Sequence, residues 1–362
     1  MLTKKKTGGL AGIVAGDSAI CLCNADEESL LYRGYSIDDL APHASFEEVA
    51  WLLTRGSPPT RQELQSYRQN LVRLRALPKP LEAILDNIPK NANKMDVLRT
   101  ACSALGTIES ENNHQIEIAD RLIAALPAAL FYWQNKRSLL ENEETHAGYL
   151  LHQIIGKIPD EIHRRCIDVS LILYAEHEFN ASTFTVRTIA STLSDFYSAI
   201  CGGIGALRGP LHGGANEAAM ELMQQFSTPR QAEEGIRQML AEKKLIMGFG
   251  HRVYTTRDPR SDIIKEWARK LCSTIEDERL FAIAEAIENR MRKEKQLFPN
   301  LDFYSALAYH FCGIPTSLFT PFFVFSRLTG WSAHLIEQRS NNKLIRPISN
   351  YIGPTQHAWK PL

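Results

Sequence analysis

One loop, Gly209-Pro210-Leu211-His212-Gly213-Gly214-Ala215-Asn216, surrounds a single histidine with three glycines and one proline. Proline and glycine favour a turn, and glycine lets a ligand come close to the backbone. The residues that follow, 217–223, are mostly strong helix formers, and Asn216 is a suitable N-cap for them. We therefore expect His212 to lie directly ahead of a helix N-terminus.

A histidine in that position has a specific chemical use. The positive end of the helix dipole disfavours the imidazolium form, so His212 is expected to stay neutral. A neutral imidazole can donate a hydrogen bond to a carbonyl oxygen that is becoming an oxyanion, which stabilises an enolate. The alternative is a turn between helices with a histidine on its surface, and the loop alone leaves both interpretations open.

Helical patterns fill most of the chain on both sides of this loop. Ser45 with Glu48 matches the capping box that starts a helix, and Thr60 begins a second capping box. Apolar residues recur every three or four positions over 189–200, which predicts one buried helix. Residues 30–35 resemble a short strand or extended arm. Because no segment is typical of a central sheet and no internal repeat is present, we expect an all-α fold.

The second half of the chain contains a turn suited to a ligand. Residues 247–250 place two glycines around one phenylalanine, and such a turn offers unpaired backbone N–H and C=O groups to a flat heterocycle or a phosphate. Helices are predicted over 259–272 and 277–295. The last long helix is expected to open at Thr320-Pro321. From Asn341 onward the tail is basic and marked by prolines, which predicts an arm lying on another surface.

The composition is that of an ordinary soluble globular enzyme. The 362 residues are 44% hydrophobic and 23% charged, and 41 basic residues balance 41 acidic ones. Without a net positive charge, nucleic acid or an anionic membrane is not expected as the main partner. No run of about 18 apolar residues suggests a membrane span, and the start does not resemble a signal peptide, so a cytoplasmic location is expected.

The cysteines argue in the same direction. Seven of them are scattered along the chain, and only Cys21 and Cys23 are close together. No pair of CxxC units predicts a zinc site. Reduced thiols in a cytoplasm fit this usage best.

A few polar residues stand in apolar or glycine-rich surroundings that packing does not explain. They are His212 and His251 in glycine turns, Asp302 between apolar residues, and Arg327 inside an aromatic helix. Each has an ordinary alternative: a loop histidine is more often structural, and Asp302 can cap the following helix. Arg260 and Arg346 would ordinarily be solvated surface charges. Together, however, these residues can remove a proton, stabilise an oxyanion and hold a dicarboxylate, which predicts carbanion chemistry.

The sequence resembles the citrate synthase superfamily along nearly its whole length. The motifs that carry the resemblance are, in chain order, GPLHGGANE, GFGHRVYTTRDPR, NLDFYSA and IRPISNYIGP. Within the superfamily it is most similar to the bacterial 2-methylcitrate synthases, as LYAEHEFNAST, MDVLRTACSALG and GHRVYT indicate. One departure is Lys94, where relatives usually have proline; it puts the start of a helix in question but affects no catalytic position.

This resemblance implies a mostly helical homodimer of two domains, each subunit closing over oxaloacetate and then binding an acyl-CoA. Residues 1–212 would form the first part of the large domain, 213–307 the small domain, and 308–362 the rest of the large domain with its C-terminal arm. The implied reaction is a Claisen-type condensation with propionyl-CoA or acetyl-CoA as co-substrate. It needs no metal and no permanently bound cofactor.

The resemblance also assigns roles by motif. Asp302 would take the α-proton of the thioester, His212 would hydrogen-bond the enolate oxygen, and His251 would donate to the oxaloacetate carbonyl. Oxaloacetate would be bound by His177, Arg260, Arg327 and the partner subunit's Arg346. The CoA adenine would contact Leu245, Ile246, Met247, Gly248 and Phe249.

Three alternatives remain at this point. Citrate synthase itself differs only in the preferred donor, and one methylene is worth about 1–3 kcal/mol, so activity with both donors is expected. A non-catalytic binding homologue would be favoured by loss of the catalytic acid or histidines, and all of these are present. A metal-dependent hydrolase lacks an HExxH motif, and His334 with Glu337 has no evident third ligand.

Overall fold

The computed structural model describes residues 9–10, 12–111, 114–136, 143–274 and 278–359. Helices dominate it, as expected for an all-α fold. Those of the first half are α1 (Ile37–His43), α2 (Phe46–Arg55), α3 (Arg61–Leu74), α4 (Lys79–Asp86), α5 (Lys94–Ile108), α6 (Gln115–Asn135), α7 (His146–Ile155) and α8 (Glu161–Tyr174). Those of the second half are α9 (Ala181–Ser191), α10 (Phe196–Leu207), α11 (Ala215–Gln224), α12 (Pro229–Ala241), α13 (Pro259–Cys272), α14 (Arg279–Lys295), α15 (Leu301–Phe311), the short 3₁₀ helix η1 (Thr316–Leu318) and α16 (Phe319–Ser340).

The strands of the described residues form one small antiparallel sheet. Its order is β1 (Cys21–Asn24), β2 (Ser29–Tyr32) and β3 (Tyr35–Ser36), with Cys23 opposite Leu30 and Tyr32 opposite Tyr35. The short strand or arm predicted over residues 30–35 is only partly correct, because β2 ends at Tyr32 and Arg33-Gly34 turn the chain into β3. The Tyr32 hydroxyl donates to the carbonyl of Glu176 at 2.9 Å, which ties the sheet to the end of α8. This bond places β1 and β2 beside the segment that carries His177.

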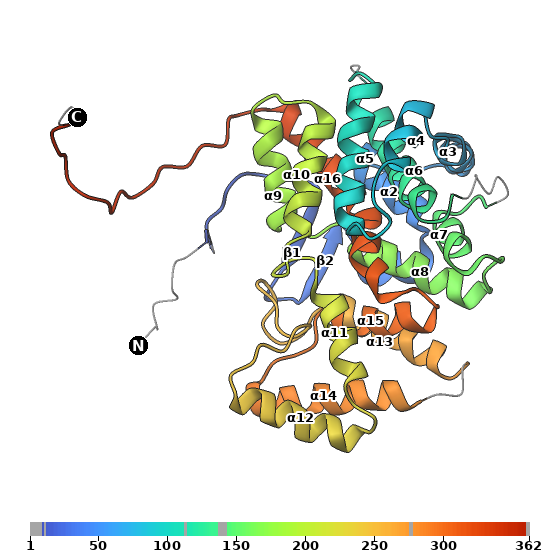
Figure 1. Ribbon diagram of the computed structural model, residues 1–362, viewed down its shortest axis with the longest axis vertical. Coiled ribbons are helices and arrows are strands. Elements are labelled where there is room, and N and C mark those ends of the chain that lie inside the picture. The colour runs from blue at the N-terminus through green and yellow to red at the C-terminus, as the bar shows by residue number, and fades with distance from the viewer. Residues whose placement is uncertain (1–8, 11, 112–113, 137–142, 275–277, 360–362) are drawn as a thin grey trace.

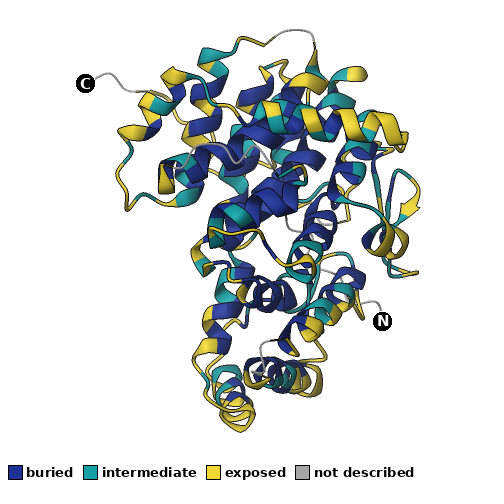
Figure 2. Cartoon of the chain, turned by 90° about the vertical axis from the view of Figure 1, so that its right-hand side faces the viewer, coloured by how far each residue is buried: buried dark blue, intermediate teal, exposed yellow. Residues whose placement is uncertain are grey.

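Helix α16 forms the centre of the larger part of the molecule. It is buried along most of its length, including Phe322, Phe325 and Leu328 as the sequence predicted. It packs against α2, α6, α8, α9 and α10. Figure 2 shows exposed residues on the outer sides of the outer helices and buried residues on the helices inside. The aromatic side chains of α16 thus supply much of the core, and Arg327 is embedded among them.

Helices α11 to α15 gather at the opposite end of the molecule from α3 to α6 (Figure 1). There α12 packs on α14, and α15 packs on both α13 and α11. Residue 307, the expected end of the small domain, falls inside α15. The segments that precede β1 and follow α16 both run away from the helical body (Figure 1).

Some local predictions were correct and others were not. Both capping boxes form, at Ser45 and at Thr60. Residues 189–200, predicted as one helix, belong to two, because Leu193 adopts a left-handed φ of 64° and Asp195 caps α10. Asn216 does not cap α11: it lies inside that helix and is buried, and Gly214 is the N-cap.

Three further helix starts bear on the sequence expectations. Helix α16 begins at Phe319 rather than at Thr320-Pro321, because η1 runs directly into it. The start of α5 is undisturbed by Lys94, since the Asn93 side chain accepts from the N–H of Met95 at 2.9 Å. Helix α14 begins at Arg279, and Asp277, where it was expected to start, lies outside the described residues.

Candidate active site

Asp302 is the first-turn carboxylate of α15. The Asn300 side chain caps this helix by accepting from the N–H of Asp302 at 3.1 Å, so capping is not the role of Asp302. The Tyr174 hydroxyl donates to its Oδ1 at 2.6 Å. Removal from water raises the pKa of Asp302 to about 6, although the Tyr174 hydrogen bond and Arg260 favour the charged form. A carboxylate with such a pKa is suited to general-base catalysis near neutral pH.

His212 lies just ahead of α11, as the sequence predicted, and its protonation state follows from its neighbours. Its Nε2 accepts from the backbone N–H of Ser182 at 3.3 Å and lies 2.8 Å from the Ser182 hydroxyl. Burial, helped by Arg327, lowers the pKa of His212 to about 4. Because a backbone N–H can only donate, the single proton of the neutral ring sits on Nδ1. Nδ1 is therefore the atom that can donate to an oxyanion.

His251 has the opposite tautomer. Its Nδ1 accepts from the backbone N–H groups of Val253 at 3.1 Å and Tyr254 at 3.2 Å. Burial and then Arg260 lower the pKa of His251 to about 4, so the ring is neutral and carries its proton on Nε2. The ring stacks on Tyr254 and meets the edge of His177, with ring centroids 4.8 Å apart in both cases. These contacts fix the direction in which Nε2 can donate.

His177 follows α8 and is buried. Burial lowers its pKa well below the ordinary value, and Arg260 and His251 act in the same direction. The sulfur of Cys23 lies 3.6 Å from Nδ1 and 3.7 Å from Nε2. His177 is therefore a neutral imidazole held between the small sheet and His251.

Arg260 is not the solvated surface charge that its sequence context alone suggested. It is only 5% exposed and forms a two-pronged ion pair with Asp258, with Nε–Oδ1 at 3.0 Å and Nη2–Oδ2 at 2.9 Å. Asp258 also accepts from the N–H of Leu301 at 3.1 Å. The pair thereby joins the start of α13 to the start of α15, one residue from Asp302.

Arg327 is a buried cation with unused hydrogen-bonding capacity. It is 1% exposed, and its Nε donates to the carbonyl of Tyr174 at 2.7 Å. Its Nη1 is buried and has no partner among the described residues. The guanidinium lies over the ring of Phe323, 4.8 Å from its centroid. An unpaired buried guanidinium nitrogen is costly unless an anion such as a carboxylate completes it.

Phe323 on α16 contacts Tyr174, His212 and Arg327. Its ring centroid lies 4.5 Å from that of Tyr174, which bonds Asp302, and 6.0 Å from that of His212. Arg260 and Arg327 both act on the charge states of Asp302 and His177. The structure therefore brings six sequence-predicted residues into one site: His177, His212, His251, Arg260, Asp302 and Arg327.

The turn predicted to bind a heterocycle is partly closed off by its own chain. The carbonyl of Gly248 accepts from the N–H of Asn300 at 2.9 Å, and the N–H of Gly250 donates to Phe298 at 2.8 Å. These backbone groups are not free, contrary to the sequence expectation. The exposed side of the turn is formed by Leu245, which is 75% exposed, and by the half-buried Met247 and Phe249, while Ile246 and Gly248 are buried.

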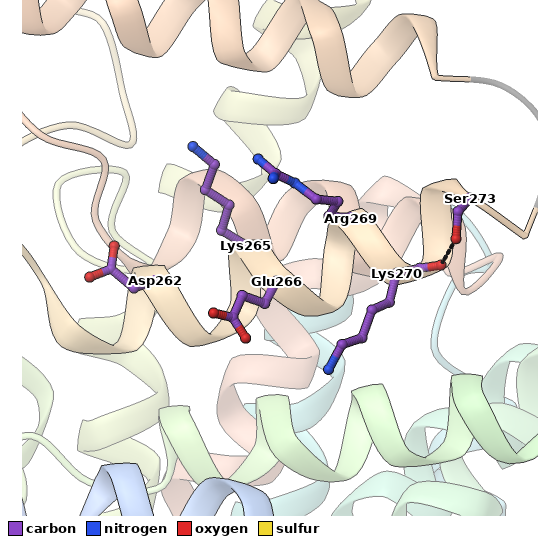
Figure 3. Close-up of a pocket in the computed structure, with 6 residues that line it drawn as sticks. All are labelled: Asp262, Lys265, Glu266, Arg269, Lys270 and Ser273. Atoms are coloured by element: carbon purple, nitrogen blue, oxygen red, sulfur yellow. Dashed lines mark hydrogen bonds between the residues drawn. The ribbon is translucent and has the colours of Figure 1, made fainter.

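Arg346 is not part of this cluster. It is exposed and directly follows Ile345, whose N–H donates to the Ser191 hydroxyl at 3.0 Å; beyond this anchor the extended segment runs away from the helical body (Figure 1). A separate surface hollow also lies apart from the cluster: it is lined by Asp262, Lys265, Glu266, Arg269, Lys270 and Ser273 on α13 (Figure 3). Lys265 pairs with Glu288 of α14 at 2.7 Å, which indicates a role in packing these two helices.

Sequence reasoning missed three residues that orient the site. Tyr174 bonds Asp302, Ser182 fixes the tautomer of His212, and Asp258 pairs with Arg260. Asp258 could have been suspected from its position two residues before Arg260. Tyr174 and Ser182 belong to the LYAEHEFNAST stretch but lie far in sequence from the residues they contact.

Comparison with known proteins identifies the family. The family model described as "Citrate synthase, C-terminal domain" matches residues 9–348. This chain belongs to the citrate synthase family. It is 50% identical to a 2-methylcitrate synthase of Shewanella oneidensis over 99% of this chain and 98% of that protein. It is 41% identical to citrate synthase 2 of Bacillus subtilis, over 98% of each chain.

Solved structures of the citrate synthase family share the fold. The ternary complex of Thermoplasma acidophilum citrate synthase with carboxymethyl coenzyme A and oxaloacetate matches with a TM-score of 0.92 and 30% identity, over 99% of both chains. No helix in the described part of this chain is both long and apolar enough to cross a membrane.

The metal-hydrolase alternative finds no support. Over the described ranges, no three His, Cys, Asp or Glu side chains are grouped so as to hold a metal ion. His334, considered above with Glu337, places its Nδ1 4.0 Å from the Glu337 carboxylate and its Nε2 2.9 Å from the buried carboxylate of Glu176.

Proposed function

We propose that this chain condenses propionyl-CoA with oxaloacetate and water, giving 2-methylcitrate and free CoA. The observation that carries the proposal is the combination of Asp302, with a pKa raised to about 6, and two neutral histidines whose free N–H groups are fixed on different ring atoms. A base and two oriented donors are what an enolate-forming condensation needs.

The proposed chemistry has three steps. Asp302 removes the α-proton of the thioester while Nδ1–H of His212 donates to the oxygen of the forming enolate. The enolate carbon then attacks the keto carbon of oxaloacetate, whose oxygen receives a hydrogen bond and then a proton from Nε2 of His251. Water finally attacks the thioester carbonyl, and the C–S bond breaks to release CoA. A neutral donor suits the first step because it stabilises the enolate without protonating it outright.

Oxaloacetate binding is assigned to the buried cations. The unpartnered Nη1–H of Arg327 would donate to one carboxylate, and Arg260 would bind oxaloacetate together with His177. The partner subunit's Arg346 would contribute a further guanidinium, which makes the enzyme a homodimer with shared sites. The exposed tail that carries this residue supports the assignment because it has no regular structure of its own.

Binding of the acyl-CoA is assigned to the turn 245–249. The adenine would lie against the exposed side of the turn, formed by Leu245, Met247 and Phe249. The division into a large domain with a small one inserted over about 213–307 remains part of the proposal. Closure of the small domain would exclude water until condensation is complete.

Citrate synthase is the second candidate, because relatives of both names align along the whole chain. The deciding experiment compares kcat/KM for CoA release from propionyl-CoA and acetyl-CoA, each with and without oxaloacetate. We expect release only with oxaloacetate and a higher kcat/KM for propionyl-CoA. A preference for acetyl-CoA would favour the second candidate, and oxaloacetate binding without CoA release from either thioester would favour a non-catalytic binding protein.

A further inference from the structure

Cys21 and Cys23 form a close pair of thiols on β1. Residues two apart on a strand point to the same face, and their sulfur atoms lie 3.8 Å apart. Both are free thiols with half-buried side chains. Burial raises the pKa of Cys21 well above its ordinary value, with the neighbouring Cys23 acting in the same direction. A raised pKa keeps Cys21 in the less nucleophilic thiol form, so Cys23, whose sulfur also contacts His177, is assigned as the sulfur that attacks the oxidant.

Cys23 also borders the active site. Its sulfur is almost equally distant from the two ring nitrogens of His177, at 3.6 and 3.7 Å, so it contacts the ring broadly rather than lining up with one nitrogen. The ring of His177 in turn contacts His251. Any change that moves the Cys23 sulfur therefore reaches a residue assigned to oxaloacetate.

We propose that Cys21 and Cys23 are a thiol-oxidation site which takes a hydroperoxide and, once joined as a disulfide, blocks oxaloacetate binding. The proposal rests on the proposed function insofar as that function makes His177 a ligand of oxaloacetate.

The oxidation balances with hydrogen peroxide as the oxidant. The Cys23 sulfur attacks one peroxide oxygen, the O–O bond breaks, and a sulfenic acid and one water are formed. The Cys21 sulfur then attacks the sulfenic sulfur, the S–S bond forms, and a second water leaves. Two thiols lose two protons and two electrons, and one peroxide becomes two waters.

The disulfide cannot form without bending β1. A disulfide needs its two Cβ atoms about 3.5–4.5 Å apart. The rise of about 3.3 Å per residue instead places the Cβ atoms of residues two apart on an extended strand about 6.6 Å apart. Bending moves the Cys23 sulfur, which now contacts His177, and disturbs the pairing of Cys23 with Leu30 on β2. Strand β2 carries Tyr32, whose hydroxyl bonds the carbonyl just before His177. The ring of His177 is thus displaced both directly and through the sheet.

The first test uses the unmodified sequence. The enzyme is treated with limiting hydrogen peroxide, the remaining thiols are alkylated, and mass spectrometry measures the fraction of Cys21–Cys23 disulfide. We expect activity loss to follow this fraction, dithiothreitol to restore activity, and bound oxaloacetate to slow the oxidation. Calorimetry on the oxidised enzyme should show oxaloacetate affinity at least tenfold weaker. A disulfide that leaves affinity unchanged, or activity loss without a disulfide, would overturn the proposal.

Variants provide the matched control. The double variant Cys21→Ser, Cys23→Ser should keep its own untreated activity after peroxide, whereas Cys201→Ser, which removes a half-buried thiol on α10, should remain as sensitive as the parent. Equal loss in both variants would contradict the proposal. Calorimetry with oxaloacetate distinguishes failure of the proposed function from failure of the oxidation site. If the untreated parent does not bind oxaloacetate, the proposed function is refuted. If it binds normally and still does so after the disulfide has formed, only the oxidation site is refuted.

Discussion

At the level of single residues, one substitution at Asp302 can separate the basicity of its side chain from its size and polarity. Asp302→Asn retains size and polarity but has no basicity, so we expect oxaloacetate to bind with near-normal affinity while condensation falls by several orders of magnitude. Calorimetry with oxaloacetate and a CoA-release assay measure the two effects. Near-parental condensation by this variant would mean that another group is the base.

The pH dependence of activity provides a second test at the same scale. A base with a pKa of about 6 must be deprotonated to work, so activity should rise with pH through about 6. The Tyr174 hydroxyl favours the charged carboxylate, so Tyr174→Phe should raise the pKa of Asp302 and move the rising limb to higher pH. A charged hydrogen bond is worth about 1.5–3 kcal/mol, which corresponds to a shift of roughly one to two pH units.

Tyr309→Phe is a suitable control for this measurement. Its hydroxyl bonds Ser170 at 2.8 Å rather than Asp302, so the pH profile should stay within a few tenths of a unit of the parent. If both variants shifted the profile equally, the Tyr174 hydrogen bond would not be the cause.

How much of the site could be predicted from sequence depended on whether the signal was local. His212 and His251 stand in glycine turns, and their surroundings alone raised the hypothesis of catalysis. The partners that set their protonation are backbone N–H groups, and for His212 the donor comes from Ser182, 30 residues away. The hydroxyl that donates to Asp302 belongs to Tyr174, which lies 128 residues away in the sequence. Such contacts exist only in the folded chain, so no single segment encodes them.

At the level of elements, the turn at Gly248 is constrained both in backbone conformation and in space. Gly248 has a φ of +87°, and a Cβ added there would lie 3.0 Å from the ring of Phe303. Gly248→Ala should lower the free energy of unfolding by about 1–3 kcal/mol and raise KM for the acyl-CoA. Chemical denaturation and steady-state kinetics measure the two changes.

Gly205→Ala on α10 is the matched control for that substitution. A Cβ at Gly205 meets nothing within 4 Å, so the variant should gain about 0.5–1 kcal/mol of stability without a change in KM. A similar KM in both variants would argue against a role of the 245–249 turn in binding CoA.

The helices themselves were predictable where their start signals are short-range. Both capping boxes act over three residues and were confirmed. The break between α9 and α10 was missed because apolar residues on both helices face the same core, so the helical period continues across the break. Leu193, counted in that period, is 73% exposed. The sequence did contain a signal for the break. It is Asp195, the N-cap of α10, whose side chain accepts from the N–H of Ser198 at 2.9 Å.

At the level of the whole molecule, the tail makes a prediction about assembly. If the partner subunit's Arg346 completes each site, chains with Arg346→Ala and chains with Asp302→Ala should complement each other. In a mixed C2 dimer one site keeps both residues, so random pairing should restore about a quarter of the sites. Activity of the co-expressed mixture, with mixed dimers confirmed by differential tags, measures this. A mixture as inactive as either parent would show that the tail serves its own chain.

Asn300 links the two protein segments that are assigned to opposite ends of the thioester substrate. Its N–H is bonded by the carbonyl of Gly248, in the turn assigned to adenine, and its side chain holds the N–H of Asp302, the proposed base. Because this hydrogen-bonded path is short, a displacement of the turn at Gly248 also shifts Asp302. Contacts made by the nucleotide can therefore help set the base in line with the carbon acid. A donor cut back to its pantetheine portion would accordingly lose turnover as well as affinity.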